Sequence, residues 1–199
     1  METRAFCWID LETTGLDLDK DEVLEVGLIY TDFNLQVLGS YHCLLRFETD
    51  VNQWDAFVVN MHEGTGLLQE LATLETLSEF NADIEMFQWL ANLKAIYNHE
   101  SIIMAGSSVG QFDRQFVRRC FPQFYKQLHY RVFDVTSLKI LSEMCRMPME
   151  DLKQHQPEHR AMNDVQNSIA YARQFFNPFI ETATQAEHVE KVLGGMLDE

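Results

Sequence analysis

The sequence predicts an α/β fold in which a mixed β-sheet is flanked by helices. Five short runs rich in apolar or β-branched residues predict strands at residues 5–9, 22–32, 36–47, 101–105 and 132–133. From residue 67 onward, apolar residues recur at helical spacing between the later strands. An opening run of strands followed by alternating helices and strands is typical of an α/β sandwich.

The first three strands are expected to form a meander that begins the sheet. Residues 5–9 are continuously apolar, which favours a buried strand. A connector of residues 33–35 (Phe-Asn-Leu) separates the next two strands and predicts a hairpin.

Helices are expected in the rest of the chain. Two should lie between Leu67 and Tyr97, with Ser78 as the N-cap of the second. Because proline lacks the N–H that continues a helix, three further helices are expected to end before prolines. They are residues 112–121 before Pro122, residues 134–145 before Pro148, and residues 158–176 before Pro178.

Length and composition are those of one globular domain. The chain has 199 residues, 46% of them hydrophobic and 23% charged. No apolar stretch approaches the roughly 20 residues that span a bilayer, and the N-terminus enters the first strand without room for a signal peptide. The four cysteines show no CxxC pair and are expected to be small core residues in a reducing cytoplasm. They are Cys7, Cys43, Cys120 and Cys145.

The net charge of −16 limits the size of a nucleic-acid partner. Only 15 Lys and Arg stand against 31 Asp and Glu, so a long track of phosphate contacts is not expected. An acidic enzyme can still act on a few nucleotides if metal ions neutralise the phosphate. The charge therefore constrains substrate length more than substrate class.

The most informative motif is Asp10-x-Glu12, followed by Thr-Thr-Gly. Side chains alternate along a strand, so Asp10 and Glu12 should project from one face where the first strand ends. Adjacent carboxylates repel each other, and a hard divalent cation such as Mg²⁺ or Mn²⁺ between them would relieve that repulsion. The alternative is a polar strand end that leads into a turn.

Two later stretches could join this pair. Asp113 follows a loop in which Ser107 and Ser108 offer hydroxyls and N–H groups to a phosphate, although an acidic residue is also favoured at any helix start. His159 precedes Asp164 by five positions at the start of the last helix. A lone histidine is usually a surface or core residue, but one beside a carboxylate near a metal is a candidate general base.

Taken in order, Asp10-x-Glu12, Asp113 and His159-x4-Asp164 resemble the three motifs of the DEDDh family of 3′-to-5′ exonucleases. The oligoribonuclease branch of that family is the most similar. Its likeness extends over segments spread from residue 5 to residue 176. These segments are residues 8–17 (WIDLETTGLD), His62-x3-Gly66-Leu67, residues 106–114, residues 129–139 (HYRVFDVTSLK) and residues 159–169.

The resemblance implies a ribonuclease H-like sandwich, a homodimer and a site with two divalent cations, Mg²⁺ or Mn²⁺. The metal ligands would be Asp10, Glu12, Asp113 and Asp164. His159 would deprotonate the attacking water. The activity implied is hydrolysis of short single-stranded oligonucleotides, preferably RNA, from the 3′ end to mononucleotides.

The resemblance also implies substrate contacts. Leu16 matches a residue that wedges against the bases, and Phe57 falls where the family has a stacking aromatic, usually Trp. Tyr130 matches a tyrosine that the opposite subunit contributes. The remaining matches are His62 and the group that caps the 5′ phosphate, which comprises Ser108, Arg131 and Thr136.

Some positions depart from the family pattern. Ser107 replaces an Asn, Thr136 replaces a Ser, and Phe112 lengthens the loop before Asp113 by one residue. The expected domain covers residues 1–180. An amphipathic extension of residues 181–199, expected to pack on the domain or on a partner, continues past the family's usual end.

Two other functions remain open. One is a DEDDh exonuclease that acts on longer RNA or DNA 3′ ends, as in proofreading or ribonuclease T-like trimming. Such substrates would be better served by basic patches, which this chain lacks. The other is a non-catalytic binding module, although such modules usually lose a carboxylate or the histidine. The residues do not distinguish RNA from DNA.

Overall fold

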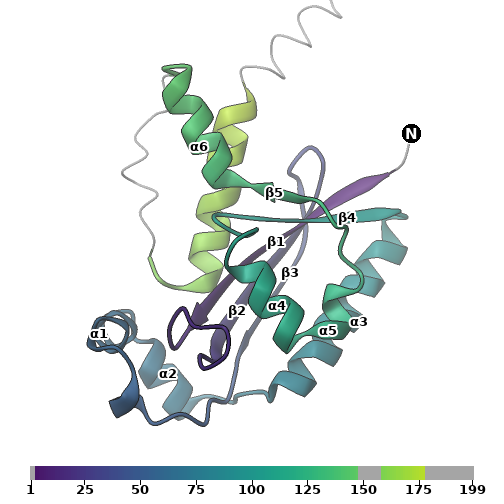
Figure 1. Cartoon of the computed structure of the whole chain (residues 1–199). Coiled ribbons are helices and arrows are strands. Elements are labelled where there is room, and N and C mark those ends of the chain that lie inside the picture. Colours follow the sequence, from purple (N-terminus) through teal and green to yellow (C-terminus); the bar gives the residue numbers. More distant parts are fainter. Residues whose placement is uncertain (1–2, 148–157, 178–199) are drawn as a thin grey trace, which may run out of the picture.

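The computed structural model describes residues 3–147 and 158–177, and these contain a five-stranded mixed sheet in the order β3-β2-β1-β4-β5 (Figure 1). The strands are β1 (Arg4–Thr13), β2 (Val23–Asp32), β3 (Val37–Leu44), β4 (Ser101–Gly106) and β5 (Val132–Asp134). The pairs β1–β2 and β2–β3 are antiparallel, whereas β1–β4 and β4–β5 are parallel. The expected mixed sheet is confirmed.

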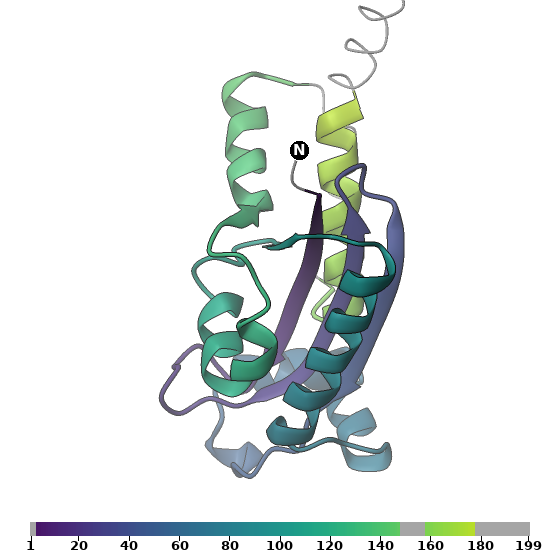
Figure 2. The ribbon, with the colours of Figure 1, turned by 90° about the vertical axis from the view of Figure 1, so that its right-hand side faces the viewer.

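Helices cover both faces of this sheet. They are the 3₁₀ turn η1 (Val51–Gln53), α1 (Ala56–Gly64), α2 (Leu67–Thr73), α3 (Glu79–Ile96), α4 (Asp113–Cys120), α5 (Pro122–Tyr125), α6 (Val135–Met144) and a last helix over residues 161–177. Figure 2 shows α3 in front of the sheet and the last helix behind it.

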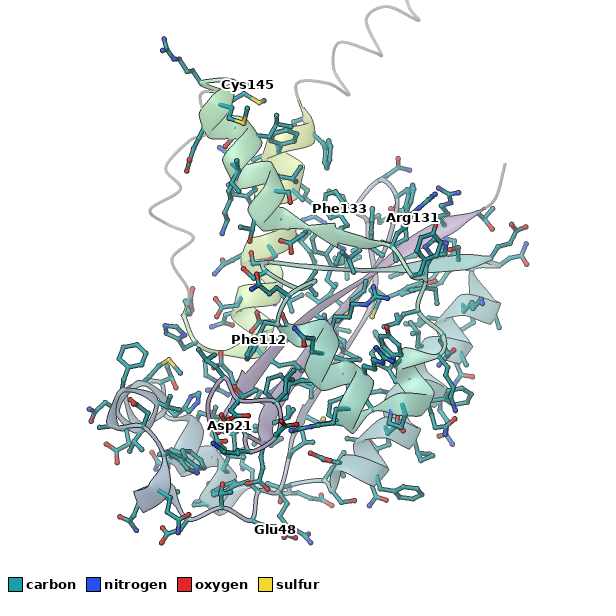
Figure 3. All side chains as sticks on the ribbon, viewed as in Figure 1. Asp21, Glu48, Phe112, Arg131, Phe133 and Cys145 are labelled. Carbon is teal, nitrogen blue, oxygen red and sulfur yellow. The ribbon has the colours of Figure 1, made fainter. Side chains whose placement is uncertain are left out.

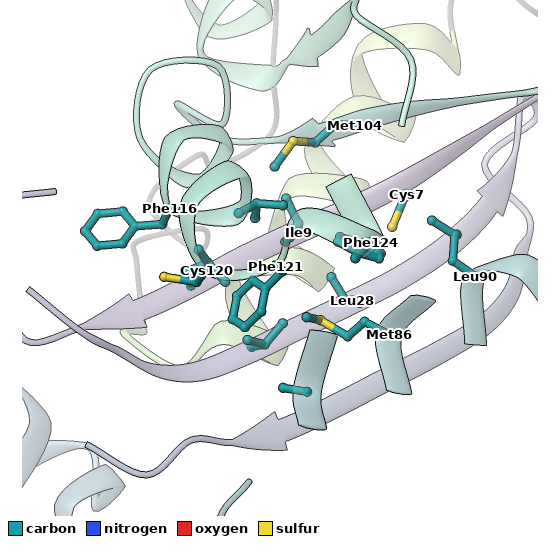
Figure 4. Packing of buried hydrophobic residues seen from close by; sticks show 14 of the residues in the cluster. Cys7, Ile9, Leu28, Met86, Leu90, Met104, Phe116, Cys120, Phe121 and Phe124 are labelled. Atoms are coloured by element: carbon teal, nitrogen blue, oxygen red, sulfur yellow. The ribbon is translucent and has the colours of Figure 1, made fainter. Parts of the chain in front are cut away.

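The central strand β1 divides the core into two layers because its side chains alternate. Cys7 and Ile9 face a cluster built with α3, α4 and α5 (Figure 4). Phe6 and Trp8 face the opposite way, toward a cluster that includes Ile169 of the last helix. This alternation decides on which face the polar end of β1 lies.

Several sequence expectations hold and others need correction. The hairpin is present, and Ser78 caps α3 by accepting the N–H of Asn81. However, β3 ends at Leu44, before the expected residue 47. A short helix, α5, also begins at Pro122. Proline suits the first position of a helix, where the missing N–H would have no intrahelical partner.

The strand β1 is longer than its apolar run predicts. It continues to Thr13 because its polar residues pair with β2: Asp10 lies opposite Gly27, and Glu12 lies opposite Glu25. The acidic pair is therefore held in regular strand structure and not in the turn that follows.

Other expectations concern the cysteines and the chain's ends. Cys7, Cys43 and Cys120 are buried as expected, but Cys145 is exposed. Pro148, Pro178 and the extension of residues 181–199 lie outside the described residues. In the part of the chain that the structure describes, no helix is long and apolar enough to span a membrane.

Candidate active site

The site begins at the polar end of β1. Asp10 and Glu12 continue the face that Phe6 and Trp8 occupy further back, so they point toward the last helix. Glu12 is buried, and Asp10 is partly exposed. The adjacent carboxylates expected from the sequence are therefore adjacent in the structure.

The last helix brings the third carboxylate to this pair. Asp164 lies in its first turn, and one oxygen each from Asp10, Glu12 and Asp164 can be chosen within 4.8 Å of one another. The carboxylate of Asp164 is itself held by the N–H groups of Glu158, at 2.9 Å, and His159, at 3.0 Å. Residues far apart in the sequence thus form one acidic cluster.

The fourth carboxylate approaches from the loop after β4. Asp113 is the first residue of α4 and is buried. Its Oδ1 accepts the N–H of Leu11, which lies between the two acidic residues of β1, at 3.1 Å. The expectation that Asp113 sits at a helix start beside the acidic pair is confirmed by this position.

Burial and mutual repulsion raise the carboxyl pKa values at this site. Burial, followed by the neighbouring charges of Asp113 and Glu12, raises the pKa of Asp10 well above its ordinary value. Burial, and then Asp164, raises the pKa of Glu12 to about 8. Burial also raises the pKa of Asp113 to about 8. Without a cation, burial and mutual repulsion therefore favour the protonated forms of Asp10, Glu12 and Asp113.

A hard divalent cation fits these residues. All four side chains offer carboxylate oxygens, which are the ligands that Mg²⁺ and Mn²⁺ prefer. Positive charge among the oxygens would relieve the repulsion that raises their pKa values. Residues Asp10, Glu12, Asp113 and Asp164 together line one cavity of about 430 Å³.

His159 lines the same cavity. Its backbone has a left-handed φ of 54°, which turns the chain just before the last helix begins. His159 is partly exposed, so solvent can reach it. His159 and Asp164, which the sequence places five positions apart, therefore line the same cavity in the structure.

The cavity is also lined by apolar side chains, which together are called its apolar wall here. Leu16 and Phe57 stand at this wall with 81% and 71% of their surfaces exposed, which is unusual for large apolar side chains. Val58, Met61 and Phe112 line it further. A cavity lined by both carboxylates and apolar side chains suits a ligand with metal-bound phosphates and flat bases.

The loop that presents Leu16 is braced from within. The carboxylate of Asp21 accepts the hydroxyl of Thr14 at 2.8 Å and the N–H of Asp17 at 2.7 Å. A Cβ on Gly15 would lie 2.4 Å from this carboxylate, so a larger residue there would displace Asp21 from these bonds. The labelled side chain of Asp21 can be followed in Figure 3.

Phe57 stands on α1, a helix that the sequence did not predict. Asp55 is its N-cap and accepts the N–H of Phe57 at 2.7 Å. The only buried residue of α1 is His62, so the helix lacks the apolar stripe that periodicity detects. The Asp55 cap was the available signal.

His62 does not reach the cavity, contrary to the expectation that it contacts substrate. It is fully buried behind Glu12: its Nε2 donates to the carbonyl of Thr13 at 2.9 Å, and its Nδ1 lies 3.9 Å from Oε2 of Glu12. Burial lowers the pKa of His62, which favours the neutral ring. The residue ties α1 to the end of β1.

Ser108 lines the cavity and is bonded to Thr136, which lies outside the lining residues. Their hydroxyl oxygens are 3.2 Å apart, and the N–H of Ser108 donates to Oδ1 of Asp134 and to Oγ1 of Thr136, both at 3.0 Å. The backbone N–H of Ser108 is therefore already bonded, contrary to the expectation that it would bind a phosphate. The two hydroxyls are hydrogen-bonded to each other.

Arg131 and Tyr130 lie outside the cavity. The guanidinium of Arg131 stacks over the ring of Tyr130, 5.2 Å from its centroid, and 70% of Tyr130 is exposed. Figure 3 shows Arg131 well apart from Phe112, which lines the cavity. Within one chain, the structure does not bring this arginine to the other expected substrate contacts.

The structure adds cavity residues that sequence reasoning missed. Of the described residues that line the cavity, Lys139 of α6 is the only Lys or Arg. Its Nζ lies over the ring of Tyr171, 5.6 Å from the ring centroid. Asn167, Ser168 and Tyr171 share the helical face of Asp164, at spacings of three, four and seven residues. That spacing, and the position of Lys139 in the segment of residues 129–139, were the available signals.

The chain matches known proteins along most of its length. The exonuclease family model (RNase_T) matches residues 7–172. The oligoribonuclease of Klebsiella pneumoniae is 32% identical over 87% of this chain and 94% of that protein. Those of Acinetobacter baylyi and Corynebacterium glutamicum are 33% and 36% identical over 85% of this chain, and over 92% and 78% of their own lengths.

Solved structures agree on the fold. Escherichia coli exonuclease I in complex with a dT13 oligonucleotide superimposes with a TM-score of 0.63 at 17% identity, over 90% of this chain. Exonuclease I of Methylocaldum szegediense gives 0.62 at 20% identity, over 86%. The chain spans only 43% and 40% of these two proteins, so they support the ribonuclease H-like fold alone. From its family match and its curated relatives, the chain belongs to the exonuclease family and, within it, to the oligoribonuclease-like DEDDh enzymes.

Proposed function

We propose that this chain is a metal-dependent 3′-to-5′ exonuclease that hydrolyses short oligoribonucleotides to mononucleotides. The observation that carries the proposal is the acidic cluster of Asp10, Glu12 and Asp164, with ligand oxygens within 4.8 Å of one another, on the floor of a cavity with an apolar wall. The family to which the chain belongs supports the reaction class.

The four carboxylates, Asp10, Glu12, Asp113 and Asp164, would hold two divalent cations, Mg²⁺ or Mn²⁺. Bound there, such cations would neutralise the scissile phosphate, acidify the attacking water and stabilise the departing 3′ oxygen. Leu11 contributes through its backbone, because its N–H fixes the orientation of the Asp113 carboxylate.

His159 acts as the general base in this proposal. It lines the cavity on the same helix start as Asp164, so its ring faces the region where the scissile phosphate would lie. Histidine is the side chain that most often serves as a general base in enzymes. The backbone N–H of His159 donates to the carboxylate of Asp164, which ties the segment that carries the base to the acidic cluster.

The substrate's bases would pack on the apolar wall, between Leu16 and Phe57. Its 5′ end would meet the hydroxyls of Ser108 and Thr136. Lys139 lines the cavity, and its ammonium group would bind the 5′ phosphate of the substrate. A cavity of about 430 Å³ is in the range of small-ligand pockets, about 300–1,000 Å³, which favours a short substrate.

Two features of the proposal require a second copy of the chain. Tyr130 and Arg131 form one stacked unit, exposed and outside the cavity. In a homodimer this unit would complete the neighbour's site, with Tyr130 against the substrate and Arg131 at its 5′ phosphate.

The proposed place of action is a reducing cytoplasm, since three of the cysteines are buried free thiols.

A degradation time course tests the proposal. RNA and DNA of two, five and twenty nucleotides, labelled at the 5′ end, are incubated with MnCl₂ or with excess EDTA. Metal-dependent shortening of the labelled strands from their 3′ ends, fastest for the shortest RNA, is expected. Full activity in EDTA would exclude metal catalysis, and equal rates at all lengths would favour the alternative of a general DEDDh exonuclease.

The histidine is tested separately. His159→Ala should lower kcat by roughly 10²–10⁴-fold, as is typical when a general base is removed, while substrate binding persists. His99→Gln is a suitable control, because His99 bonds Tyr30 at the other end of the sheet. Near-normal turnover of His159→Ala would assign the histidine a structural role.

A further inference from the structure

The strand next to β1 holds the helix that carries the rest of the site. Glu25 and Gly27 of β2 lie directly opposite Glu12 and Asp10 in the antiparallel register. Residues opposite each other in such a pair share a face of the sheet. Glu25 and Gly27 therefore face the last helix, as the two site carboxylates do.

Glu25 binds the first turn of that helix. Its Oε2 accepts the N–H of Ala161 at 3.0 Å, and its carboxylate accepts the guanidinium of Arg160, with N–O distances of 3.1–3.3 Å. His42 lies 2.7 Å from Oε1. Only 1% of the Glu25 side chain is exposed, so these contacts replace water almost entirely.

Gly27 sets how closely the same helix approaches the sheet. A Cβ at this position would lie 2.7 Å from the backbone carbon of Ala161 and 2.8 Å from the backbone nitrogen of Met162. Both atoms are main chain, so they cannot rotate away. Any side chain larger than hydrogen would push the helix start from the strand.

Arg160 extends this contact to α2, the next helix along the chain from the one that carries Phe57. Its guanidinium also binds the carboxylate of Glu70 on α2, at 2.5 and 3.1 Å. The segment before α2 is α1, which carries Phe57. One arginine, adjacent in sequence to His159, thus joins β2 and the last helix to α2, the helix that follows α1.

We infer that Glu25, Gly27 and Arg160 are positioning residues, which fix the distance between the carboxylates of β1 and the helix start that carries His159 and Asp164. None of the three lines the cavity, so they act through the residues they hold. The inference rests on the proposed function for its kinetic consequences, but the arrangement it describes also governs metal affinity.

Gly27→Ala is the most direct test. The added methyl group displaces the helix start, and a shift of about 1 Å in a catalytic group can cost roughly 100-fold in rate. We expect kcat on a dinucleotide to fall at least about tenfold with KM changed less than about threefold, because the lost interactions belong to the transition state. Mn²⁺ affinity, measured by calorimetry without substrate, should also fall.

The matched control is Gly39→Ala on β3. Its added Cβ would meet the end of the Leu93 side chain at 2.9 Å, which disturbs packing on the other face of the sheet. This variant should lose thermal stability while it keeps wild-type kcat and Mn²⁺ affinity. A comparable loss of kcat in Gly39→Ala would show that general destabilisation suffices, and would overturn the inference.

Arg160→Lys and Arg160→Gln give a second series should Gly27→Ala fail to fold. Lysine keeps the charge but cannot reproduce the forked contact with two carboxylates. We expect kcat to fall in the order wild type, Lys, Gln, with the lysine variant recovering part of the loss. Wild-type kcat and Mn²⁺ affinity in a folded Gln variant would overturn the inference. If the wild type were inactive on every oligonucleotide, the proposed function would fail, and Mn²⁺ affinities would still decide the positioning roles.

Discussion

The carboxylate of Asp113 accepts a 3.1 Å hydrogen bond from the backbone N–H of Leu11. Leu11 lies between the two acidic residues of β1, so this bond joins the start of α4 to the acidic end of the strand. The side chain of Leu11 packs in the core on the other face. A core residue therefore orients a site residue through its main chain alone.

Asp113→Asn should separate this structural bond from the proposed metal role. The amide oxygen of asparagine can still accept the Leu11 N–H, so the fold should be retained. The lost charge should lower kcat at least about 100-fold, or ~2.7 kcal/mol of transition-state stabilisation. Steady-state rates with MnCl₂ and circular dichroism measure the two effects. Asp50→Asn, at an exposed helix cap away from the cavity, is the control. Unimpaired turnover of Asp113→Asn would remove Asp113 from the metal site.

Metal-free stability should depend on pH in a defined direction. Burial, and then Asp164, raises the pKa of Glu12 from 4.5 to about 8 in the folded protein. The folded state therefore binds this proton more tightly than the unfolded chain does. The resulting stability is fully present below about pH 4.5 and is lost as pH rises through about 8.

Glu12→Gln removes this titration. In EDTA at about pH 9 its Tm should exceed that of the wild type by about 5 °C, the shift for ~2 kcal/mol in a protein of this size. MgCl₂ should raise the Tm of the wild type more than that of the variant. Thermal melts from about pH 5 to about pH 9 measure both. A wild-type Tm that climbs steadily with pH would contradict the expectation.

Most of the acidic site could be predicted from the sequence because its members sit in local patterns. Asp10-x-Glu12 follows an apolar strand, and His159 precedes Asp164 at a helix start. Glu25 and Gly27 could not be found in this way. Their importance depends on which residues of β1 they face and on which helix packs over them, and both are properties of the tertiary fold.

The substrate side was less predictable than the acidic floor. The segment of residues 129–139 drew attention to Arg131, yet within the chain Lys139 lines the cavity and Arg131 stacks on Tyr130. The motif identified the segment, but the tertiary path of the chain through β5 and α6 decides which basic residue of the segment lines the cavity. Helix α1 escaped prediction because only His62 among its residues is buried.

The exposed aromatic at the cavity should contribute to substrate binding. Phe57→Ala should lower kcat/KM for a dinucleotide by roughly 5–150-fold, since base–aromatic stacking contributes about 1–3 kcal/mol. Phe57→Trp should keep or improve it. Phe80 on α3 is an equally exposed control, at 73% against 71%, and does not line the cavity. Equal effects of Phe57→Ala and Phe80→Ala on kcat/KM would argue against a stacking role.

The dimer proposed from Tyr130 predicts complementation. Tyr130→Ala and Asp10→Ala should each be nearly inactive alone. Mixed, they should regain activity, because the Asp10→Ala subunit lends its Tyr130 to the intact metal site of the other. Light scattering on the wild type measures the oligomeric state. A fully active monomer would refute the shared site, and so would a mixture of folded variants that stays inactive.

The dependence of kcat/KM on substrate length should show whether Lys139 or Arg131 binds the 5′ phosphate of the substrate. A chain of net charge −16 repels a long polyanion, while the described part of the cavity lining offers Lys139 to one phosphate. We expect kcat/KM to be highest for dinucleotides and at least about tenfold lower for five-mers, or ~1.4 kcal/mol.

Lys139→Ala should remove most of this preference, since a hydrogen bond to a charged group contributes roughly 1.5–3 kcal/mol. Arg131→Ala should do so only if a partner subunit delivers the arginine with Tyr130, so its effect should disappear in any monomeric form. Lys126→Ala, on a lysine outside the cavity lining, is the charge-matched control. Dinucleotides without a 5′ phosphate should lose the preference in the wild type. If removing either cation left the ratio of dinucleotide to five-mer rates unchanged, the length selectivity would have to come from the apolar wall alone.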